Sequence, residues 1–478
     1  MHPQEICDKY VKENNAISRV LDAGYGKIYL LYIKQLCDME AMRQDIMRPI
    51  LQYWHYLKKP LSVQELYTQV LCVEECKLLK CEEEIEPQLF SGIAILLLES
   101  GEGILINIRK NASSSPSAPE LNYSVWGAKD SFVENIEINL SLLRYRMKDP
   151  RLRTEMILVG KRTQTAVLVS YLSDVANDKY VDLVRKRLKT IDIDGILEAG
   201  HLQWFLKDKK FGLFPQVGLE QRVDLACGAM LEGKVLILCE GSPVAIIAPK
   251  LLAEFFHADD DESETVYFSV FSKILRFLCV LISVTITPLY IALVAFHAEA
   301  LPTAYTMVLA SGRAGVPVTV VTEIILMEIL VEVLRECLMR IPKNIGSAIG
   351  IVGGIVVGQA TVEAGIVSPL VLVIVALSLM TSFVVPDYSL SGTVRIVKFA
   401  MIFLTAFFGM LGLTAGLFLL FGAAISDTSL HTPYFAPYAP FSLRDALKSI
   451  FTNKYVSVCR PSFLHPKNKV RQKKKPSL

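Results

Sequence analysis

The spacing of apolar positions changes along the chain and divides it into two parts. In residues 1–273, short apolar runs alternate with helical patterns, which is typical of an α+β region. Beyond residue 273 the apolar runs become long enough to cross about 30 Å of hydrocarbon. Four such runs predict a polytopic α-helical membrane domain over 274–426, and they lie at 277–296, 345–362, 366–385 and 399–426.

Within residues 1–273 the predicted elements occur twice in the same order. Each half begins with an apolar strand, continues through helical segments and ends in a hairpin that begins near a glycine. The segment 111–126 is rich in Ser and Pro, a composition that does not pack, and separates the halves. We therefore expect two related cytosolic α/β subdomains, 1–110 and 127–273. The predicted strands are 27–33, 92–98 and 103–109 in the first, and 155–159, 166–171, 234–239 and 243–247 in the second.

A fifth candidate membrane segment, 316–340, differs from the other four because it carries many charges. Both chain ends are expected in the cytoplasm, so the number of crossings must be even and this segment cannot simply join the other four. We expect it to be re-entrant, interfacial or packed inside an oligomer.

Three carboxylates follow one face of this segment at intervals of four residues, at Glu328, Glu332 and Glu336. Arg335 and Arg340 stand three and four residues after Glu332 and Glu336, so structural ion pairs are expected between them. Glu323 and Glu328 have no such partner within the helix. They are candidates for contact with a cation or water in a pore, unless a partner lies on another helix.

The run at 345–362 has a glycine at every fourth position, a pattern that lets a second helix approach closely. Two polar residues, Gln359 and Glu363, stand one turn apart beside this ridge. A pore-lining role and a capping role at the membrane interface are equally consistent with them. The glycines are Gly346, Gly350, Gly354 and Gly358.

Charge is distributed unevenly, although the whole chain carries only +2. The region 1–273 is acidic, 274–426 balances seven acids with seven bases, and 427–478 has ten Lys and Arg against two Asp. We expect this last region to be a basic cytoplasmic tail attracted to anionic membrane lipids. The same attraction is a simpler explanation of Lys473–Lys475 than nucleic-acid binding.

No constellation of catalytic, metal-ligating or cofactor-binding residues emerges from the sequence. The seven His lack metal-ligand spacing, and the ten Cys lack a disulfide or zinc pattern, so reduced thiols are expected. Asp192 and Asp194 do not complete a calcium loop and are expected to cap a helix. We therefore expect a protein that is not an enzyme.

Several segments together resemble the A subunit of GerA-type spore germination receptors. They include Lys129-Asp-Ser-Phe-Val-Glu-Asn-Ile-Glu-Ile-Asn139, Ile351-Val-Gly-Gly-Ile-Val-Val-Gly-Gln-Ala360 and Pro433-Tyr-Phe-Ala-Pro437. The resemblance implies a homo-oligomeric ring around an ion-conducting pore that opens on germinant sensing. It also implies a transporter-like B subunit, a lipoprotein C subunit and a place in the spore inner membrane, where monovalent cations would leave the spore.

Two alternatives to a channel remain at this point. A secondary transporter would bind a solute at broken helices near the membrane midplane. Against it, the repeat lies in the soluble region, and the membrane segments show no inverted repeat. A scaffold that anchors the other subunits is the third possibility.

Overall fold

The computed structural model describes residues 3–14, 16–22, 26–56, 62–71, 73, 75–79, 81–109, 127–451 and 457–471. The predicted linker, Cys72 and Lys473–Lys475 lie outside these residues. The chain divides into two compact units. The first comprises Met1–Lys207, Val217–Pro249 and Val458–Leu478, and the second comprises Asp208–Gln216 and Lys250–Ser457.

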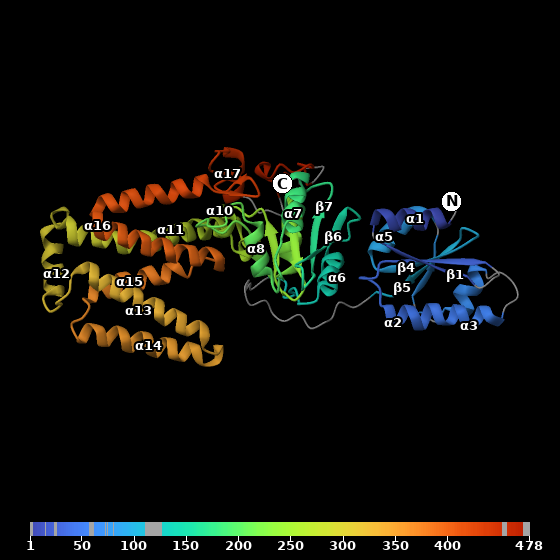
Figure 1. Ribbon diagram of the computed structural model, residues 1–478, viewed down its shortest axis with the longest axis horizontal. Helices are drawn as coiled ribbons and strands as arrows, with labels where there is room; N and C mark the ends of the chain where they lie inside the picture. The colour runs from blue at the N-terminus through green and yellow to red at the C-terminus, as the bar shows by residue number, and fades with distance from the viewer. Residues whose placement is uncertain are drawn as a thin grey trace. The chain divides into compact units, whose positions relative to one another are not determined.

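The first subdomain is a five-stranded antiparallel sheet with helices on both faces (Figure 1, blue). Its strand order is β1-β2-β4-β5-β3. Alternation along the strands supplies two cores, because Leu30 and Leu96 face α2 to α4 whereas Leu31 and Leu97 face α1 and α5. The elements are α1 (Pro3–Asn14), β1 (Ile17–Asp22), β2 (Lys27–Tyr32), α2 (Met39–Ala41), a π-helical turn (Met42–Met47), α3 (Arg48–Tyr56), α4 (Val63–Glu65), a second π-helical turn (Leu66–Val70), β3 (Cys76–Leu78), α5 (Ile85–Phe90), β4 (Ile93–Leu98) and β5 (Gly103–Asn107).

The second subdomain repeats this architecture with strand order β6-β7-β9-β10-β8. Leu168 and Leu238 pack against α6 and α9, and Gly233 ends α9 in a left-handed conformation with φ 103° before the chain enters β9. Its elements are α6 (Ile136–Arg146), β6 (Leu152–Val159), β7 (Thr165–Leu172), α7 (Asp178–Lys189), α8 (Ala199–Leu206), β8 (Gly218–Glu220), α9 (Val223–Glu232), β9 (Val235–Cys239) and β10 (Ala245–Ala248).

The two sheets share one topology. In each subdomain the third strand along the chain, β3 or β8, pairs with the fifth, β5 or β10, and forms an edge of the sheet. This shared order is the relationship that an internal duplication predicts. The strands β1, β3 and β8 are not among those predicted from the sequence. All three are edge strands, and β3 and β8 have only three residues each, too few for an alternating pattern to stand out.

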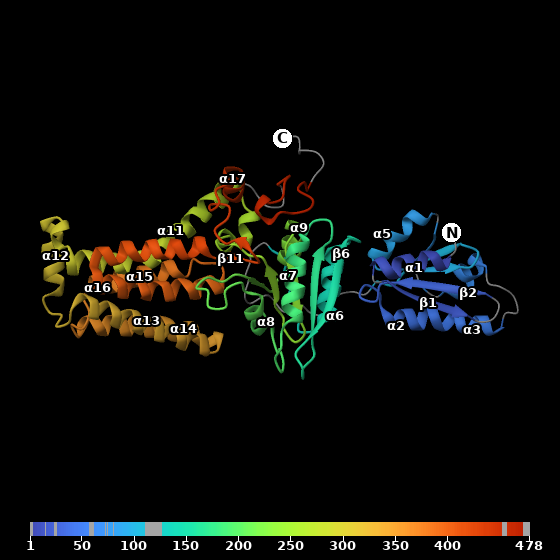
Figure 2. The same cartoon turned by 45° about the horizontal axis from the view of Figure 1, so that its top comes forward.

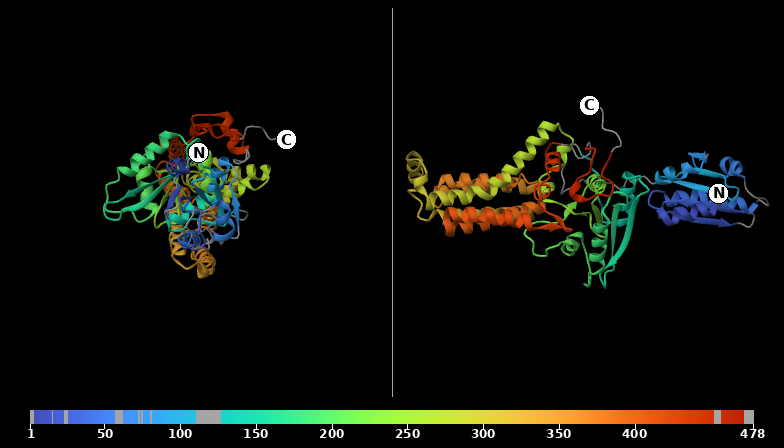
Figure 3. Two further views of the ribbon diagram at one scale, coloured as in Figure 1. Left: turned by 90° about the vertical axis from the view of Figure 1, so that its right-hand side faces the viewer. Right: turned by 90° about the horizontal axis from the view of Figure 1, so that it is seen from above.

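The second unit is built from helices that run side by side (Figures 2 and 3). The helix α11 continues into a π-helical turn that ends at Phe296, and α12 follows before the charged helix α13. The elements are α10 (Leu252–Phe255), α11 (Val266–Ile291), α12 (Thr303–Arg313), α13 (Val320–Arg340), α14 (Lys343–Glu363), α15 (Pro369–Ser382), α16 (Tyr388–Ser426), β11 (Thr428–Ser429), β12 (Thr432–Pro433) and α17 (Leu443–Phe451).

The segment α16 is a helical hairpin and not one continuous helix. Gly409 interrupts it with φ 60° and ψ −136°, a conformation that residues with a Cβ rarely adopt. Both ends of α16 meet Lys250: its Nζ lies 2.8 Å from Asp387 Oδ2 before the first half, and its backbone N–H donates to Ser429 Oγ at 3.2 Å just beyond the second. A straight helix of 39 residues would separate these ends by about 58 Å.

The hairpin closes tightly because glycines line its inner face. A Cβ on Gly412 would collide with the backbone of Leu404, and one on Gly416 would lie 2.5 Å from Met401 Sδ. At the tip, a Cβ on Gly409 would lie 2.9 Å from Phe296 Cγ, so the end of the hairpin packs against the end of the α11 segment.

The run 399–426, expected as one membrane span, therefore contributes parts of two antiparallel helices. Its turn contains no charged residue, and hydropathy alone could not reveal it. The run 366–385 forms a shorter helix than expected, because Pro369 starts α15 and the helix ends at Ser382. Within the part of the chain that the structure describes, two helical segments are both long and apolar enough to cross a membrane, Val266–Phe296 and Tyr388–Ser426.

Candidate functional site

Four acidic residues of α13 form ion pairs, and together they are called the α13 ladder: Glu323, Glu328, Glu332 and Glu336. The pair at Glu328, the central rung of this ladder, is fully buried. Lys398 Nζ, from the first half of α16, lies 2.6 Å from Glu328 Oε2, and each side chain is 1% exposed. Thr287 of α11 donates its hydroxyl to Glu328 Oε1 at 3.2 Å. A buried charge is tolerated when it is paired and its remaining oxygen is hydrogen-bonded, so this rung holds three helices together.

Five residues before Glu328 on the same helix, Glu323 contacts two further segments. Its Oε1 accepts hydrogen bonds from the backbone N–H and the hydroxyl of Ser368, both at 2.5 Å, and Arg313 Nε of α12 lies 3.4 Å from its Oε2. Since Ser368 is the residue before α15, the carboxylate lies at the N-terminus of that helix, where the helix dipole favours negative charge. Glu323 thereby fixes α12 and α15 to α13.

On the other side of the central rung, Glu332 meets two arginines. Arg395 Nη1 of α16 lies 2.7 Å from Glu332 Oε1, and Arg335 Nη1 lies 3.7 Å from Glu332 Oε2. Arg335 also donates to Ser382 Oγ at 2.9 Å and lies over the ring of Phe383. The ladder therefore links α13 to the end of α15 as well as to α16.

The last rung, Glu336 with Arg340, is a surface pair. Arg340 Nη2 lies 2.7 Å from Glu336 Oε1, at the spacing of four residues that the sequence suggested. Both side chains are more than half exposed, so this pair adds little to stability.

Glu323 and Glu328 were singled out from the sequence because no partner stood near them on their own helix. The structure supplies those partners from α12 and α16, and this removes the argument that assigned the two carboxylates to a pore. A signal was present in the sequence, since Arg395 and Lys398 are cations close together in an otherwise apolar segment. Matching them to particular acids required the helix register.

Gln359 and Glu363 have a different environment on α14. Gln359 Nε2 donates to Glu363 Oε1 at 2.9 Å, and both side chains are exposed in the single chain. Among the described residues, the side chains of Gln359 and Glu363 form hydrogen bonds only with each other. They form a small polar patch at the C-terminal end of α14, after the apolar stretch 348–358.

Only part of the glycine ridge of α14 packs against other helices of the same chain. Gly350 faces Leu338 of α13, and Gly358 faces Leu372 of α15, at Cβ distances of 3.1 and 3.6 Å. A Cβ on Gly354 would meet no described heavy atom within 4 Å. The surroundings of Gly346 fall outside the described side chains. The middle of the ridge is thus open on the single chain.

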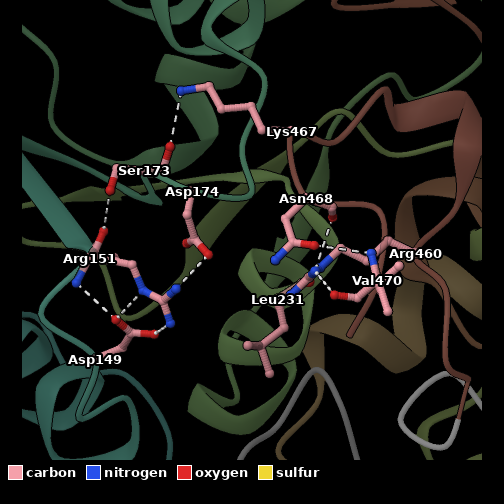
Figure 4. A network of polar contacts seen from close by, with 9 residues as sticks. All are labelled: Asp149, Arg151, Ser173, Asp174, Leu231, Arg460, Lys467, Asn468 and Val470. Atoms are coloured by element: carbon pink, nitrogen blue, oxygen red, sulfur yellow. Dashed lines mark hydrogen bonds and ion pairs between the residues drawn. The ribbon is translucent and has the colours of Figure 1, made fainter. Parts of the chain in front are cut away.

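The basic tail folds back onto the second α/β subdomain (Figure 4). Lys467 Nζ donates to the carbonyl of Ser173 at 3.0 Å and lies 2.7 Å from Asp178 Oδ1. Arg460 Nε donates to the carbonyl of Leu231 at the end of α9, at 2.6 Å, and its Nη1 binds the carbonyls of Asn468 and Val470. Lys467 and Arg460 thus bind protein groups, a role that the attraction to anionic lipids expected from the sequence did not include.

The pair Asp192 and Asp194 does not cap a helix, contrary to expectation. Both lie in the loop between α7 and α8, where Asp192 pairs with Lys161 at 2.5 Å and Asp194 lies 3.8 Å from Arg162. The next helix begins at Ala199 with Glu198 before it. The described residues contain no group of three or more His, Cys, Asp or Glu arranged to hold a metal ion.

Two buried thiols of the α/β subdomains, Cys37 and Cys227, are unreactive because of their surroundings. Burial raises the pKa of Cys37 and of Cys227 to about 12 in each case. They therefore serve as small apolar core groups at neutral pH.

A family model described as "Bacillus/Clostridium GerA spore germination protein" matches residues 4–462. The chain belongs to this GerA family of germination receptor A subunits. It is 32% identical over 458 residues to spore germination protein KA of Bacillus subtilis (strain 168), covering 95% of this chain and 84% of that protein. It is 29% identical over 440 residues to the uncharacterized membrane protein YfkQ of the same organism, covering 92% of this chain and 85% of that protein.

Among solved structures, the chain is similar to the N-terminal domain of the A subunit of the Bacillus megaterium spore germinant receptor GerK3. The two are 26% identical with a TM-score of 0.40, and the match covers 52% of this chain and 93% of that one.

Proposed function

We propose that this GerA family chain spans the inner membrane of the dormant spore, and that an oligomer of it opens a pathway for monovalent cations when a germinant is sensed. One observation carries the proposal: α13 uses Glu323, Glu328 and Glu332 in pairs with other segments of the helical unit, whereas α14 leaves Gln359 and Glu363 exposed at the end of its apolar stretch. Such a polar patch would be costly against lipid and is suited to a water-filled path.

The register of the ion pairs supports an even number of crossings. Glu328 with Lys398 and Glu332 with Arg395 make the first half of α16 antiparallel to α13. Glu323 with Ser368 and Arg335 with Ser382 make α15 parallel to α13, as two helices joined through α14 must be. With α11, α14 and the second half of α16, the helices make six passes. This count keeps both chain ends in the cytoplasm and makes α13 one of the passes, in place of the re-entrant, interfacial or oligomer-buried position expected from the sequence.

The open middle of the glycine ridge supports assembly into a homo-oligomer. Ile355 and Val356 beside Gly354 are 61% and 58% exposed, and a second copy could approach this small-residue face closely. In that assembly Gln359 and Glu363 would line the pathway, with the carboxylate favouring cations. A transporter-like B subunit and a lipoprotein C subunit complete the proposed receptor, on the basis of family membership.

Cation flux from liposomes containing the purified oligomer tests the proposal. We expect potassium release that Glu363→Gln and Gln359→Leu reduce several-fold or make less selective for cations over anions. Glu336→Gln is the matched control, because it removes an exposed carboxylate from α13 and should leave flux unchanged. Wild-type conductance and selectivity in both α14 variants would refute their place in the pathway. Uptake that depends on an added solute would favour a transporter, and absence of any flux a scaffold.

A further inference from the structure

A cavity of about 490 Å³ lies within the helical unit. It is partly open and is enclosed by α10, α11, both halves of α16 and α17. Its volume falls within the range of about 300–1,000 Å³ that is usual for organic ligands. The walls are almost entirely apolar, and Phe277, Val284, Leu390, Val397 and Leu420 are among them.

Two basic side chains, Lys273 and His257, also line this cavity. Lys273 lies on α11 just before the long apolar run, and its Nζ donates to the carbonyl of Ser449 on α17 at 3.3 Å. The neighbouring cation on α11, Arg276, is held in a bidentate pair with Asp261 at 2.5 and 2.6 Å. An apolar interior with an ammonium group on its lining matches an anionic amphiphile.

The helix α17 beside the cavity has the character of a helix that lies in a membrane surface. Leu443, Leu447 and Phe451 recur every fourth residue and are 61%, 47% and 53% exposed, which aligns them on one face. Arg444 and Lys448 follow the first two of these residues directly. An apolar face flanked by cations binds to an anionic leaflet through both buried area and charge.

We infer that the cavity takes up an acyl chain of an anionic phospholipid, with the headgroup phosphate at Lys273 and next to α17. The inference rests on the proposed membrane location and does not depend on ion conduction. Charge complementarity selects this occupant, because a zwitterionic lipid or a second copy of the chain would gain less from the ammonium group at Lys273.

Quenching of tryptophan fluorescence by brominated phospholipids tests the inference on the full chain in bilayers. One variant, Leu420→Trp, reports on the cavity. The matched variant Phe418→Trp reports on bulk lipid, because Phe418 lies two residues away on the same helix and is 80% exposed. The protein without an added tryptophan gives the background. Each protein is measured in phosphatidylcholine with a small fraction of brominated phosphatidylglycerol or brominated phosphatidylcholine.

We expect the Leu420→Trp signal to be quenched several-fold more by brominated phosphatidylglycerol than by the same fraction of brominated phosphatidylcholine. The Phe418→Trp signal should follow the bulk fraction of either lipid. Adding Lys273→Gln should abolish the preference at position 420, and Lys273→Arg should retain it.

Equal quenching by both lipids at position 420 would overturn the inference, because the cavity would then be an unselective lipid contact. No quenching at 420 would overturn it too, since protein would fill the cavity. If neither position is quenched by any brominated lipid, the membrane location itself fails, and this outcome is distinct from a failure of ion conduction.

Discussion

Lys398 and Glu328 form an ion pair at 2.6 Å between two helices, and neither side chain is more than 1% exposed to solvent. We expect Lys398→Met to destabilise the protein by about 3–5 kcal/mol, because it leaves the Glu328 carboxylate buried without a counter-charge. Adding Glu328→Gln should recover most of that loss, since a neutral pair has no uncompensated charge. Thermal unfolding of the purified protein in detergent measures both effects.

The exposed pair on the same helix provides the control for this comparison. Arg340→Met should change the unfolding free energy by no more than about 1 kcal/mol, as is usual for surface pairs. If the double variant at Lys398 and Glu328 is no more stable than Lys398→Met alone, the pair does not act as the structure indicates.

The hairpin of α16 predicts a sharp difference between two of its glycines. Gly412→Val should destabilise the protein by about 1–3 kcal/mol or prevent closure, because its side chain would collide with the backbone at Leu404. Gly422→Val is the matched change, since a Cβ there meets no described heavy atom within 4 Å. Thermal unfolding midpoints that fall equally for both variants would contradict the hairpin.

The tail contacts predict that residues 458–471 protect part of the second α/β subdomain. Deleting residues 458–478 should increase amide hydrogen exchange near Ser173–Asp178 and at the end of α9, where Lys467 and Arg460 bind backbone carbonyls. Lys467→Gln should raise exchange only near Ser173. Lys469→Gln serves as the control, and an unchanged exchange pattern after the deletion would show that the tail does not dock there.

An acid-dependent contribution to stability is expected from Glu155. The hydrogen bond from Arg185 holds the pKa of this carboxyl below its ordinary value, with a further contribution from Tyr171. A lowered pKa in the folded state stabilises the protein above the ordinary carboxyl pKa of about 4.3, and this contribution disappears as pH falls through the lowered value. Glu155→Gln should therefore weaken the dependence of the unfolding temperature on pH below about 4.5.

The exposed acid Glu198 offers a comparison for that pH series, because its side chain is 60% exposed. Glu198→Gln should leave the pH profile close to that of the unchanged protein. A profile for Glu155→Gln that matches the unchanged protein would show that the pair with Arg185 does not contribute.

Much of the α/β region could be predicted from sequence because its central strands are continuous apolar runs. The strands β2, β4, β7 and β9 are buried on both faces and stand out from their surroundings. Edge strands such as β3 do not stand out in this way. Their strand conformation comes from pairing with a neighbouring strand and not from their own composition. The repeat was recognisable since it depends on the order of the strong elements.

The ion pairs of the candidate site were harder to predict from sequence, because most of the paired residues lie far apart along the chain. Pairs three or four residues apart, such as Glu336 with Arg340, follow from helix geometry alone. Glu328 and Lys398 are separated by 70 positions, and only the packed register brings them together. The docking of the tail on the second subdomain is likewise a tertiary event, and a run of basic residues alone is equally compatible with lipid.

The closed hairpin of α16 has a consequence for how the protein is made. Its two halves begin and end beside Lys250, and the turn at Gly409 is formed by apolar residues and glycine. In the proposed membrane setting, no polar loop therefore has to cross to the far side at this turn, and the charges of the hairpin, Arg395 and Lys398, stay in its first half, paired with α13. The hairpin could then leave the translocon as a single unit. Both of its ends would remain on the side of the membrane where Lys250 lies.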